Sequence, residues 1–238
     1  MAVVHGGSSE TTRVAERLGH PPRFVTSPSG HSSRYTDRET MEIFVMVAAG
    51  RINKRLVLQL QRLGVEAVGI SGVDGGLLEA RRKGTLRIVE DGKRRLLRGD
   101  FSGTIQRVRA GLLDTLLTAG HVPVIAPIAI GDAGEALNVD GDRAAASIAA
   151  AVGAHRLVIL SNVPGLLRDV SREESLIKTV SQDQMQDVLD RFAFGRMKRK
   201  LLGAISALEN GVAEVILADG RRNTPLQAAL AGHGTRIT

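Results

Sequence analysis

The chain has 238 residues, of which 43% are hydrophobic and 24% charged, enough for one large domain or two packed lobes with a substantial core. It contains no cysteine, which excludes disulfides and thiolate metal sites. A formal net charge of +7 predicts an acidic partner: a nucleotide phosphate, a nucleic acid or an acidic protein. Aromatic residues make up only 3% of the chain, which disfavours a protein that stacks the bases of single-stranded nucleic acid.

Targeting and metal-binding signals are missing from the sequence. No apolar run is long enough to span a bilayer and no charged-then-apolar leader opens the chain, so we expect a cytoplasmic protein without a membrane partner. The six histidines have no metal-ligand spacing and form no Ser/His/Asp arrangement. We therefore predict neither a metal site nor a covalent nucleophile.

In the first half of the chain, strand and helix patterns alternate. They predict, in chain order, a strand at 2–4, a helix at 10–18, a Pro-, Ser- and Gly-rich loop at 21–37, helices at 38–49 and 51–63, a strand at 65–70, one or two hairpins at 77–98 and a helix at 110–119. Asp37 suits the N-cap of the helix that follows it, and we expect Gly50 to separate the two adjacent helices. The dipeptide Asp91-Gly92 predicts a hairpin turn.

The second half of the chain shows the same alternation. It predicts a strand at 122–127, a glycine loop at 130–135, a helix at 143–152, a strand at 157–160, helices at 185–192 and 201–208, a strand at 214–218, a short helix at 225–231 and a last edge strand at 235–237. Such alternation predicts an α/β fold whose largely parallel sheet is sandwiched between helices.

Glycine-rich turns follow Val4, Ile70, Ile125 and Leu160, near the ends of four predicted strands. Parallel sheets bind ligands at this edge, and glycine lets the backbone approach an anion closely. None of the turns has the Walker or the dinucleotide-binding glycine pattern, which argues against a P-loop NTPase and a Rossmann dehydrogenase.

The stretch Asn138-Val139-Asp140-Gly141-Asp142 places two carboxylates and an amide before a predicted helix. Asp142 alone can be explained as an N-cap. One helix start needs only one cap, however, so capping does not explain why Asp140 and Asp142 are both present. Two carboxylates this close repel each other unless cations lie nearby. The run Gly195-Arg196-Met197-Lys198-Arg199-Lys200 supplies cations at another helix start, where they oppose the helix dipole and favour a bound anion. A solvated charge run or a nucleic-acid patch is the alternative interpretation.

A polar segment, Gly30-His31-Ser32-Ser33-Arg34-Tyr35-Thr36-Asp37, precedes the helix that begins at residue 38. Arg34 in this segment can hold a substrate carboxylate through two parallel hydrogen bonds. The alternative is an ordinary surface arginine.

Seven motifs in order resemble the amino acid kinase family, and most closely its acetylglutamate kinase-like members that act on carrier-protein-bound 2-aminoadipate. The motifs are Val3-Val4-His5-Gly6-Gly7, Arg34-Tyr35-Thr36-Asp37, Ser71-Gly72-Val73-Asp74-Gly75, Pro123-Val124-Ile125-Ala126-Pro127, Asn138-Val139-Asp140-Gly141-Asp142, Leu160-Ser161-Asn162-Val163-Pro164-Gly165-Leu166 and Met197-Lys198-Arg199-Lys200. The resemblance covers essentially the whole chain. The segment 30–40 is the part that favours the carrier-dependent members.

This resemblance implies a three-layer α/β/α sandwich with a mainly parallel central sheet. It implies an N-terminal lobe at 1–135 for the carboxylate substrate and a C-terminal lobe at 136–238 for ATP, with Mg²⁺ carried by the nucleotide. The implied reaction is attack of a side-chain carboxylate on the γ-phosphate, giving an acyl phosphate in lysine or arginine biosynthesis. In such a transfer, positioning and charge neutralisation carry the rate.

The resemblance also assigns roles to individual residues. Backbone amides of Gly6, Gly7 and Ser8 would bind substrate, Arg34 its α-carboxylate, and Asn138 would hydrogen-bond it. Lys200 would stabilise charge on the transferred phosphoryl, and Asp142 would orient the active-site lysines. The residues implied for nucleotide binding are Ser161, Asn162, Gly165 and Met197.

The implied partner is a small acidic amino-group carrier protein that bears the substrate. The arginine-rich hairpin between Arg81 and Arg98 and the charge of +7 offer it a basic docking surface. We also expect a homo-oligomer and no nucleic-acid partner.

The chain departs from the family pattern in three respects. The family's first strand and its Lys-x-Gly-Gly loop have no counterpart in this chain, so we expect either that the start is misassigned or truncated, or that one catalytic lysine and one sheet element are missing. Ser8 stands in place of the third glycine of the first turn. Asp140 and Asn162 stand where relatives often carry Asn and Asp.

Two other functions remain open at this point. The first is an acetylglutamate kinase acting on free N-acetylglutamate, or a bifunctional enzyme that also phosphorylates carrier-bound glutamate. The second belongs to another class: a basic nucleic-acid or regulatory binding protein that is catalytically inactive.

Overall fold

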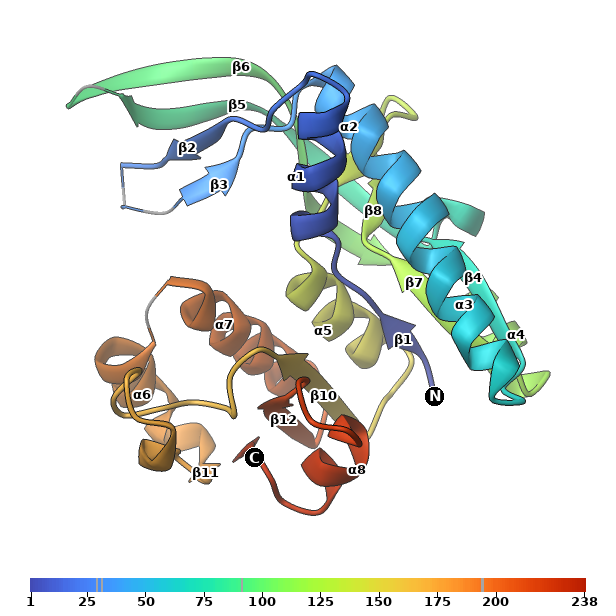
Figure 1. Cartoon of the computed structure of the whole chain (residues 1–238), viewed down its shortest axis with the longest axis vertical. Coiled ribbons are helices and arrows are strands. Elements are labelled where there is room, and N and C mark those ends of the chain that lie inside the picture. The colour runs from blue at the N-terminus through green and yellow to red at the C-terminus, as the bar shows by residue number, and fades with distance from the viewer. Residues whose placement is uncertain (29, 31, 91, 194) are drawn as a thin grey trace. The chain divides into compact units, whose positions relative to one another are not determined.

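The computed structural model describes residues 1–28, 30, 32–90, 92–193 and 195–238, with only the backbone of Arg196. The chain forms two compact units, Met1–Ala144 and Ala145–Thr238 (Figure 1). The predictions made at His31 and at Asp91, and for the side chain of Arg196, lie outside the described residues.

The first unit contains a three-stranded parallel sheet in the order β1 (Val3–Val4), β7 (Val122–Ala126) and β4 (Ala67–Ser71). Val4 and Ile70 both pair with Ile125, so the three strands end level with one another. Val124 and Ile125 are fully buried, as expected for a central strand covered on both faces.

The first unit also contains several helices. They are α1 (Ser8–Arg17), α2 (Arg38–Val45), the π-helix η1 (Met46–Ile52), α3 (Asn53–Arg62), the short η2 (Asp74–Gly76), α4 (Gly111–Thr118) and the first turn of α5 (Gly141–Ala151). The apolar face of α2 and η1 packs through Met41, Phe44 and Ala48 against Ala126 and Ile128. This packing covers the end of β7.

A second sheet of the first unit is built around one long hairpin. Its strand order is β3 (Ser32–Arg34), β2 (Phe24–Thr26), β5 (Leu78–Glu90), β6 (Lys93–Val108), β9 (Ala136–Asn138) and β8 (Ile128–Ile130). Strands β5 and β6 pair from Leu78 and Val108 out to Glu90 and Lys93. The predicted hairpin is therefore confirmed as a single, long one.

The second unit is a four-stranded sheet with helices packed on it. The strand order is β10 (Arg156–Ser161), β12 (Glu214–Asp219), β13 (Thr235–Ile237) and β11 (Thr179–Val180). The helices are the rest of α5, the short η3 (Glu173–Ser175) and η4 (Gln182–Gln184), α6 (Met185–Phe192), α7 (Gly195–Glu209) and α8 (Pro225–Leu230). Strands β10 and β12 are parallel, so both units contain parallel strands and the predicted α/β class is confirmed.

Three details of the predicted fold are wrong. The loop expected at 21–37 contains β2 and β3, because pairing of Thr26 with Val89 of β5 gives this polar segment a sheet edge to join. The break expected at Gly50 does not occur, because η1 continues the helix there. Ala48 and Ile52 of η1 pack against Gly7, within 3.7 Å of the position that a Gly7 β-carbon would take. This packing offsets the cost of roughly 1 kcal/mol for placing Gly50 inside a helix. The strand at 235–237 is not at an edge, because β12 and β11 pair with its two sides.

None of the helices in the described ranges is long and apolar enough to cross a membrane.

The buried hydroxyl of Thr235 generates a stability prediction. Its Oγ1 accepts a hydrogen bond from the Leu166 amide (2.8 Å) and donates one to the Ile177 carbonyl (2.6 Å), and the residue is fully buried. Thr235→Val keeps the shape but leaves two buried backbone groups unpaired, so we expect a loss of about 3 kcal/mol of unfolding free energy in urea titrations. The same change at exposed Thr179 should cost less than about 0.5 kcal/mol, and equal costs at both sites would contradict this interpretation.

Candidate active site

The carboxyl ends of β1, β4 and β7 bring three loops to one edge of the parallel sheet. The turn His5–Ser8 follows β1, Gly72 follows β4, and Pro127 follows β7. The His5 amide still donates to the Ile125 carbonyl (3.2 Å), and the Gly72 amide donates to that of Ala126 (3.2 Å). Ligands bind at this edge in open α/β sheets, which makes it the candidate site of the first unit.

The turn after β1 leads directly into α1. Gly6 is exposed, and a β-carbon there would meet no atom within 4 Å, whereas one on Gly7 would crowd Ile52 at 3.2 Å. Gly7 is the N-cap and provides no side-chain cap, so Ser8 begins the helix with its first amides unpaired within the helix. Such a helix start suits an anion, because the amides and the dipole both favour negative charge.

Arg34 lies at this helix start. One of its guanidinium nitrogens, Nη2, donates to the Ser8 carbonyl (2.9 Å), Ser8 Oγ (3.3 Å) and Thr12 Oγ1 (2.7 Å). The other, Nη1, is buried without a hydrogen-bond partner, and the guanidinium stands 5.4 Å from the Phe24 ring centroid. Burial lowers the pKa of Arg34, yet an arginine stays charged in any protein. A buried, charged donor without a partner is costly, which favours a bound carboxylate here.

Asn138, at the end of β9, is attached to the same segment. Its Nδ2 donates to Thr36 Oγ1 (3.1 Å), two residues after Arg34. The Thr36 amide in turn donates to Oδ1 of the fully buried Asp100 on β6 (3.0 Å), and the Phe101 amide donates to the Thr36 carbonyl (2.6 Å). The segment that carries Arg34 is therefore tied to both β6 and β9.

The turn into α5 lies beside the turn after β1. A β-carbon on Gly141 would be 3.9 Å from both the His5 carbonyl and Pro127 Cγ. Oδ1 of Asp140 accepts from the Arg143 amide (3.0 Å), which makes Asp140 the N-cap of α5. Asp142 lies inside the first turn of the helix, so the N-cap explanation does not apply to its carboxylate.

The second unit carries the remaining candidate residues. Ser161 ends β10 and pairs in register with Asp219 at the end of β12. Gly165 has φ +153°, and a β-carbon there would lie 2.6 Å from Thr235 Oγ1, so this glycine is required by packing. Asn162 lies in the turn between Ser161 and Gly165.

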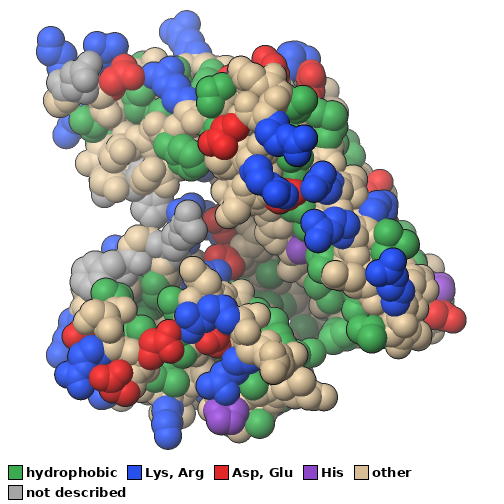
Figure 2. Space-filling model, in the orientation of Figure 1, with side chains coloured by type: hydrophobic (Ala, Val, Ile, Leu, Met, Phe, Trp, Pro, Cys, Tyr) green, Lys and Arg blue, Asp and Glu red, His purple; other side chains and the backbone are tan. Residues whose placement is uncertain are grey.

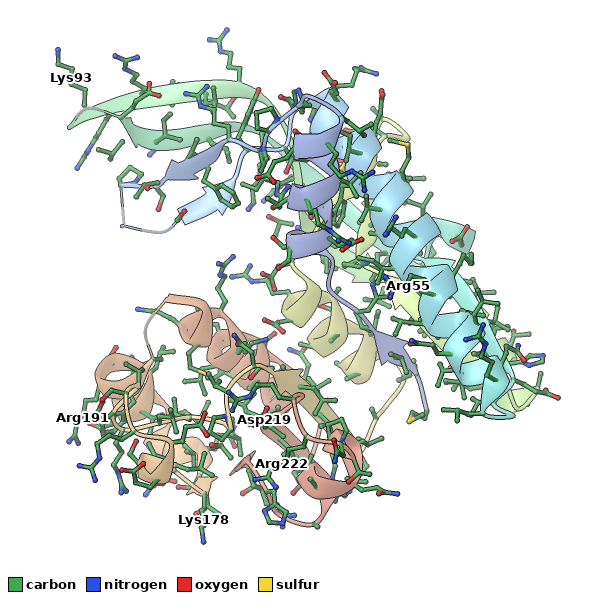
Figure 3. All side chains as sticks on the ribbon, in the orientation of Figure 1. Arg55, Lys93, Lys178, Arg191, Asp219 and Arg222 are labelled. Carbon is green, nitrogen blue, oxygen red and sulfur yellow. The ribbon has the colours of Figure 1, made fainter. Side chains whose placement is uncertain are left out.

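Asp219 is held by an arginine that the sequence interpretation missed. Hydrogen bonds from the Arg221 guanidinium (2.7 and 2.8 Å) lower the pKa of Asp219 to about 2, and Arg221 also contacts Glu173 (2.8 Å). Figure 3 shows Asp219 on the second unit. In the sequence, Asp219 directly follows the predicted strand at 214–218, as the other turns follow theirs. That position was the signal that could have indicated Asp219 as a candidate site residue.

Helix α7 carries Met197 and Lys200. Met197 packs against the hydrophobic core of the second unit, and Lys200 is partly exposed one turn further along. The structure thus brings Gly6, Gly7, Ser8 and Arg34 together in the first unit, with Asn138 attached through Thr36. The other candidates, Ser161, Asn162, Gly165, Met197 and Lys200, belong to the second unit.

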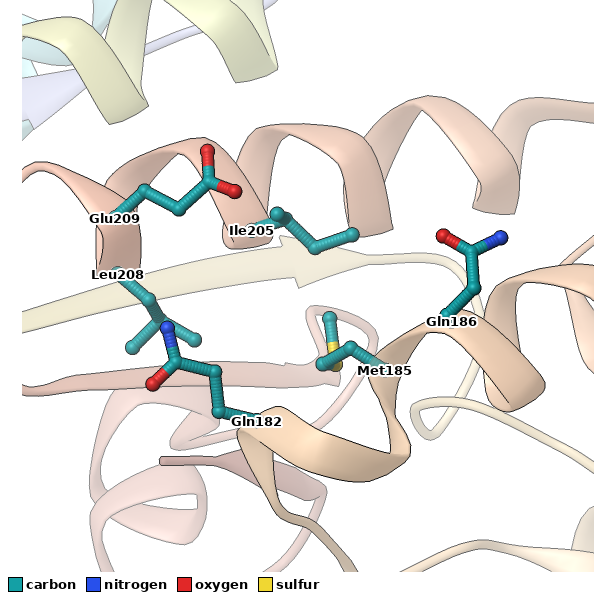
Figure 4. Close-up of a pocket in the computed structure, with 6 residues that line it drawn as sticks. All are labelled: Gln182, Met185, Gln186, Ile205, Leu208 and Glu209. Carbon is teal, nitrogen blue, oxygen red and sulfur yellow. The ribbon is translucent and has the colours of Figure 1, made fainter.

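A small pocket of about 180 Å³ lies between η4, α6 and α7 (Figure 4). Its lining residues are Gln182, Met185, Gln186, Ile205, Leu208 and Glu209. These side chains come from the helices and not from the strand ends, so the pocket is no part of the candidate site. No group of three His, Asp or Glu side chains that could hold a metal occurs in the described ranges.

Residues 1–219 match the model of the amino acid kinase family, and this chain belongs to that family. It is 55% identical over 238 residues to a LysW-aminoadipate kinase of Deinococcus radiodurans, covering all of this chain and 81% of that protein. It is 43% identical over 236 residues to an acetylglutamate kinase of Methanopyrus kandleri, covering 99% of this chain and 89% of that protein. The predicted family and the prediction of an enzyme, a kinase that uses ATP, are confirmed.

A solved N-acetylglutamate synthase of Neisseria gonorrhoeae, crystallised with coenzyme A and N-acetyl-glutamate, shares the fold. The TM-score is 0.79 at 28% sequence identity, over 100% of this chain. This chain spans about half the length of that synthase, 51%. The predicted amino acid kinase fold is confirmed.

The Asp219–Arg221 pair generates a pH prediction. Because the pKa of Asp219 is depressed to about 2 from an ordinary 3.8, its contribution to stability is present above about pH 4 and is lost as the pH falls through 2. Urea titrations from pH 6 to pH 2 should show wild type more stable than Asp219→Asn near neutrality, with the difference shrinking below pH 4. A difference that stays constant over this range would contradict the pairing.

Proposed function

We propose that this chain phosphorylates the side-chain carboxylate of 2-aminoadipate bound to an amino-group carrier protein, using ATP, in lysine or arginine biosynthesis. The observation that supports this acceptor most directly is the buried, unpartnered Nη1 of Arg34 beside the start of α1. The name of the relative from Deinococcus radiodurans supports the carrier-bound form. A cytoplasmic location agrees with the use of ATP.

We assign the acceptor to the first unit. Arg34 offers two guanidinium nitrogens to the α-carboxylate, and the amides of Gly6, Gly7 and Ser8 offer donors to the reacting end of the substrate. Asn138, held by Thr36, offers its remaining amide oxygen to the substrate.

We assign the nucleotide to the second unit, at the ends of β10 and β12. Leu160 is 41% exposed there. Gly220 has no side chain to obstruct the turn, and a β-carbon on Gly220 would lie 3.2 Å from the Ser161 carbonyl. An exposed apolar side chain beside open backbone fits a purine ring and its ribose. Ser161, Asn162, Gly165 and Met197 are the residues we expect near ATP, with Mg²⁺ bound by the phosphates rather than by a cluster of side chains.

In the proposed reaction, a carboxylate oxygen of the acceptor attacks the γ-phosphorus, and the bond to the β–γ bridging oxygen breaks. ADP leaves with that electron pair, and the product is an acyl phosphate. The transferred group carries negative charge throughout, so the residues supply positioning and opposite charge. We assign charge stabilisation to Lys200 and orientation of the cationic groups to Asp142.

The test is an assay of ADP release and of acyl phosphate trapped with hydroxylamine. The acceptors are aminoadipate on its carrier, glutamate on its carrier and free N-acetylglutamate, the last because an acetylglutamate kinase is also similar to this chain. Product with carrier-bound aminoadipate but not with free N-acetylglutamate supports the proposal. Turnover of free N-acetylglutamate alone contradicts it and supports that second candidate.

Arg34 is tested by a substitution that keeps its charge. Arg34→Lys retains a cation but loses the planar fork, so we expect the KM for the acceptor to rise about tenfold while the KM for ATP is unchanged. Arg13→Lys, at an exposed arginine of α1, is the matched control and should leave both constants as they are. An unchanged acceptor KM in Arg34→Lys would rule out the carboxylate role.

The basic hairpin is the surface we propose for the acidic carrier. Side chains alternate between the two faces of a strand, and cross-strand partners share a face. Pairing of Val89 with Arg94, Arg87 with Leu96 and Thr85 with Arg98 therefore puts three arginines on one face around Leu96, which is 64% exposed. Arg95 pairs with buried Ile88 on the other face and contacts Glu90 (3.0 Å).

Figure 2 shows Lys and Arg side chains gathered on this hairpin, and Figure 3 places Lys93 at its tip. We call the surface formed by Arg87, Arg94, Leu96 and Arg98 the open basic face. Exposed charges steer an acidic partner, and an exposed leucine between them adds apolar contact area. The homo-oligomer expected from the resemblance remains a prediction.

Two matched neutralisations test this docking surface. Arg94→Gln removes a charge from the open basic face, so the KM for the carrier-bound acceptor should rise about threefold at low salt and less at high salt. Arg95→Gln removes the same charge from the opposite face and should have a smaller effect. Equal effects of the two changes, or none from either, would contradict docking on the open basic face.

A further inference from the structure

Asn53, the first residue of α3, is a buried polar side chain that connects all three strands of the parallel sheet. Its Nδ2 shares two hydrogens among three acceptors: the Val124 carbonyl on β7 (2.8 Å), the Ile70 carbonyl on β4 (3.1 Å) and Nε2 of His5, directly after β1 (3.2 Å). Its Oδ1 accepts from Lys54 Nζ (3.2 Å), and the side chain is completely buried. A β-carbon on Gly69 would overlap Oδ1, so the sheet is shaped to receive this amide.

The two ring contacts of His5 determine its tautomer. The Gly6 carbonyl can only accept, so the ring proton is on Nδ1, which donates to it (3.0 Å), and the unprotonated Nε2 accepts from the Asn53 amide. The ring is buried, and burial lowers the pKa of His5 while its hydrogen bond to Gly6 opposes that shift. Neutral His5 therefore links Asn53 to the backbone of the turn.

The Gly6 carbonyl fixes the direction of the next amide. In a planar trans peptide, the C=O of Gly6 and the N–H of Gly7 point in opposite directions. A carbonyl held by the His5 ring thus directs the Gly7 amide away from that ring. A β-carbon on Gly6 would meet no atom within 4 Å, so no side-chain packing at Gly6 opposes this orientation of the peptide plane.

We infer that Asn53 is a positioning residue: through His5 it sets the peptide plane between Gly6 and Gly7, and so aims the Gly7 amide at the acceptor. Its effect on the reaction rests on the proposed function, whereas the hydrogen-bond relay exists independently of it. Asn53 touches no reacting group itself. The same relay makes the turn sensitive to protonation of His5, because a protonated Nε2 would face the Asn53 amide as a second donor.

Charged residues lie on several of the described elements around this ring. Lys54 of α3 donates to Asn53 Oδ1 and to the Gly69 carbonyl. Asp140 and Asp142 flank Gly141, which adjoins the His5 carbonyl. Arg51 of η1 is paired with Glu10 of α1. Strands β4 and β7 carry no charged residue. We expect an acid limb in acceptor binding at a pH below the ordinary histidine value of 6.5, since burial lowers this pKa.

The kinetic test compares Asn53→Ala with Leu113→Ala, a cavity variant at a fully buried residue of α4 in the same unit. Asn53→Ala should raise the acceptor KM about tenfold with the KM for ATP unchanged, while Leu113→Ala changes neither constant. If both variants only lower kcat, in proportion to the folded fraction, Asn53 is a structural residue and the inference is wrong.

Substitutions of His5 provide the second test and avoid a large cavity. The amide nitrogen of Asn occupies the position of Nδ1, so His5→Asn keeps the donor to Gly6 but has no acceptor for the Asn53 amide; it should abolish the acid limb and raise the acceptor KM as Asn53→Ala does. His5→Gln places its amide at the Nε2 position, loses that donor and should raise the acceptor KM about tenfold. Each substitution breaks one of the two hydrogen bonds of the relay, so an acceptor KM equal to that of wild type in either variant would overturn it.

A third readout needs no activity and separates failure of the relay from failure of the proposed function. Nitrogen-15 NMR of wild type should show the Nδ1–H tautomer of His5. The Gly7 amide signal should shift in Asn53→Ala, in His5→Gln and in His5→Asn. An Nε2–H tautomer in wild type, or an unmoved Gly7 signal in Asn53→Ala, would overturn the inference even if the enzyme is active.

Discussion

The fully buried amide of Asn53 joins β1, β4 and β7 at the edge where their turns begin. Buried polar groups are tolerated only when they are paired, and here the backbone of two strands and the ring of His5 supply the partners. The π-helix η1 that precedes Asn53 also brings Ile52 and Ala48 against Gly7. The junction of η1 and α3 therefore fixes both the sheet edge and the start of α1, on which the candidate acceptor site depends.

A second buried polar group, Asp100, connects this edge to the hairpin. Its carboxylate accepts from the amides of Thr36 and Ser102 (3.0 Å each), and Tyr35 Oη donates to the Arg98 carbonyl on the same strand (2.7 Å). The segment that carries Arg34 is thus held by β6, the strand that also carries Arg94, Leu96 and Arg98 of the open basic face. In the proposed function, one strand would link the surface that docks the carrier to the arginine that binds its substrate.

Local sequence patterns predicted most strands and helices, because apolar periodicity and glycine turns are local signals. They failed where tertiary pairing decides: β2 and β3 form on the edge of β5, Gly50 lies inside η1, and β13 is flanked by two strands. Among site residues, Gly6, Gly7 and Arg34 were identifiable from motifs. Asn53 and Asp219 were not, because a polar residue inside an amphipathic helix or after a strand looks like any surface residue until its burial and partners are known.

The central claim is that the turn at Gly6 to Ser8, together with Arg34, binds the acceptor, while the turns after β10 and β12 bind ATP. Backbone amide chemical shifts of the labelled protein, titrated separately with each ligand, test it directly. Carrier-bound aminoadipate should move the signals of Gly6, Gly7, Ser8 and Arg34, and an ATP analogue those of Ser161, Asn162 and Asp219. An acceptor that perturbs only the second unit, or a nucleotide that perturbs only the first, would contradict the claim.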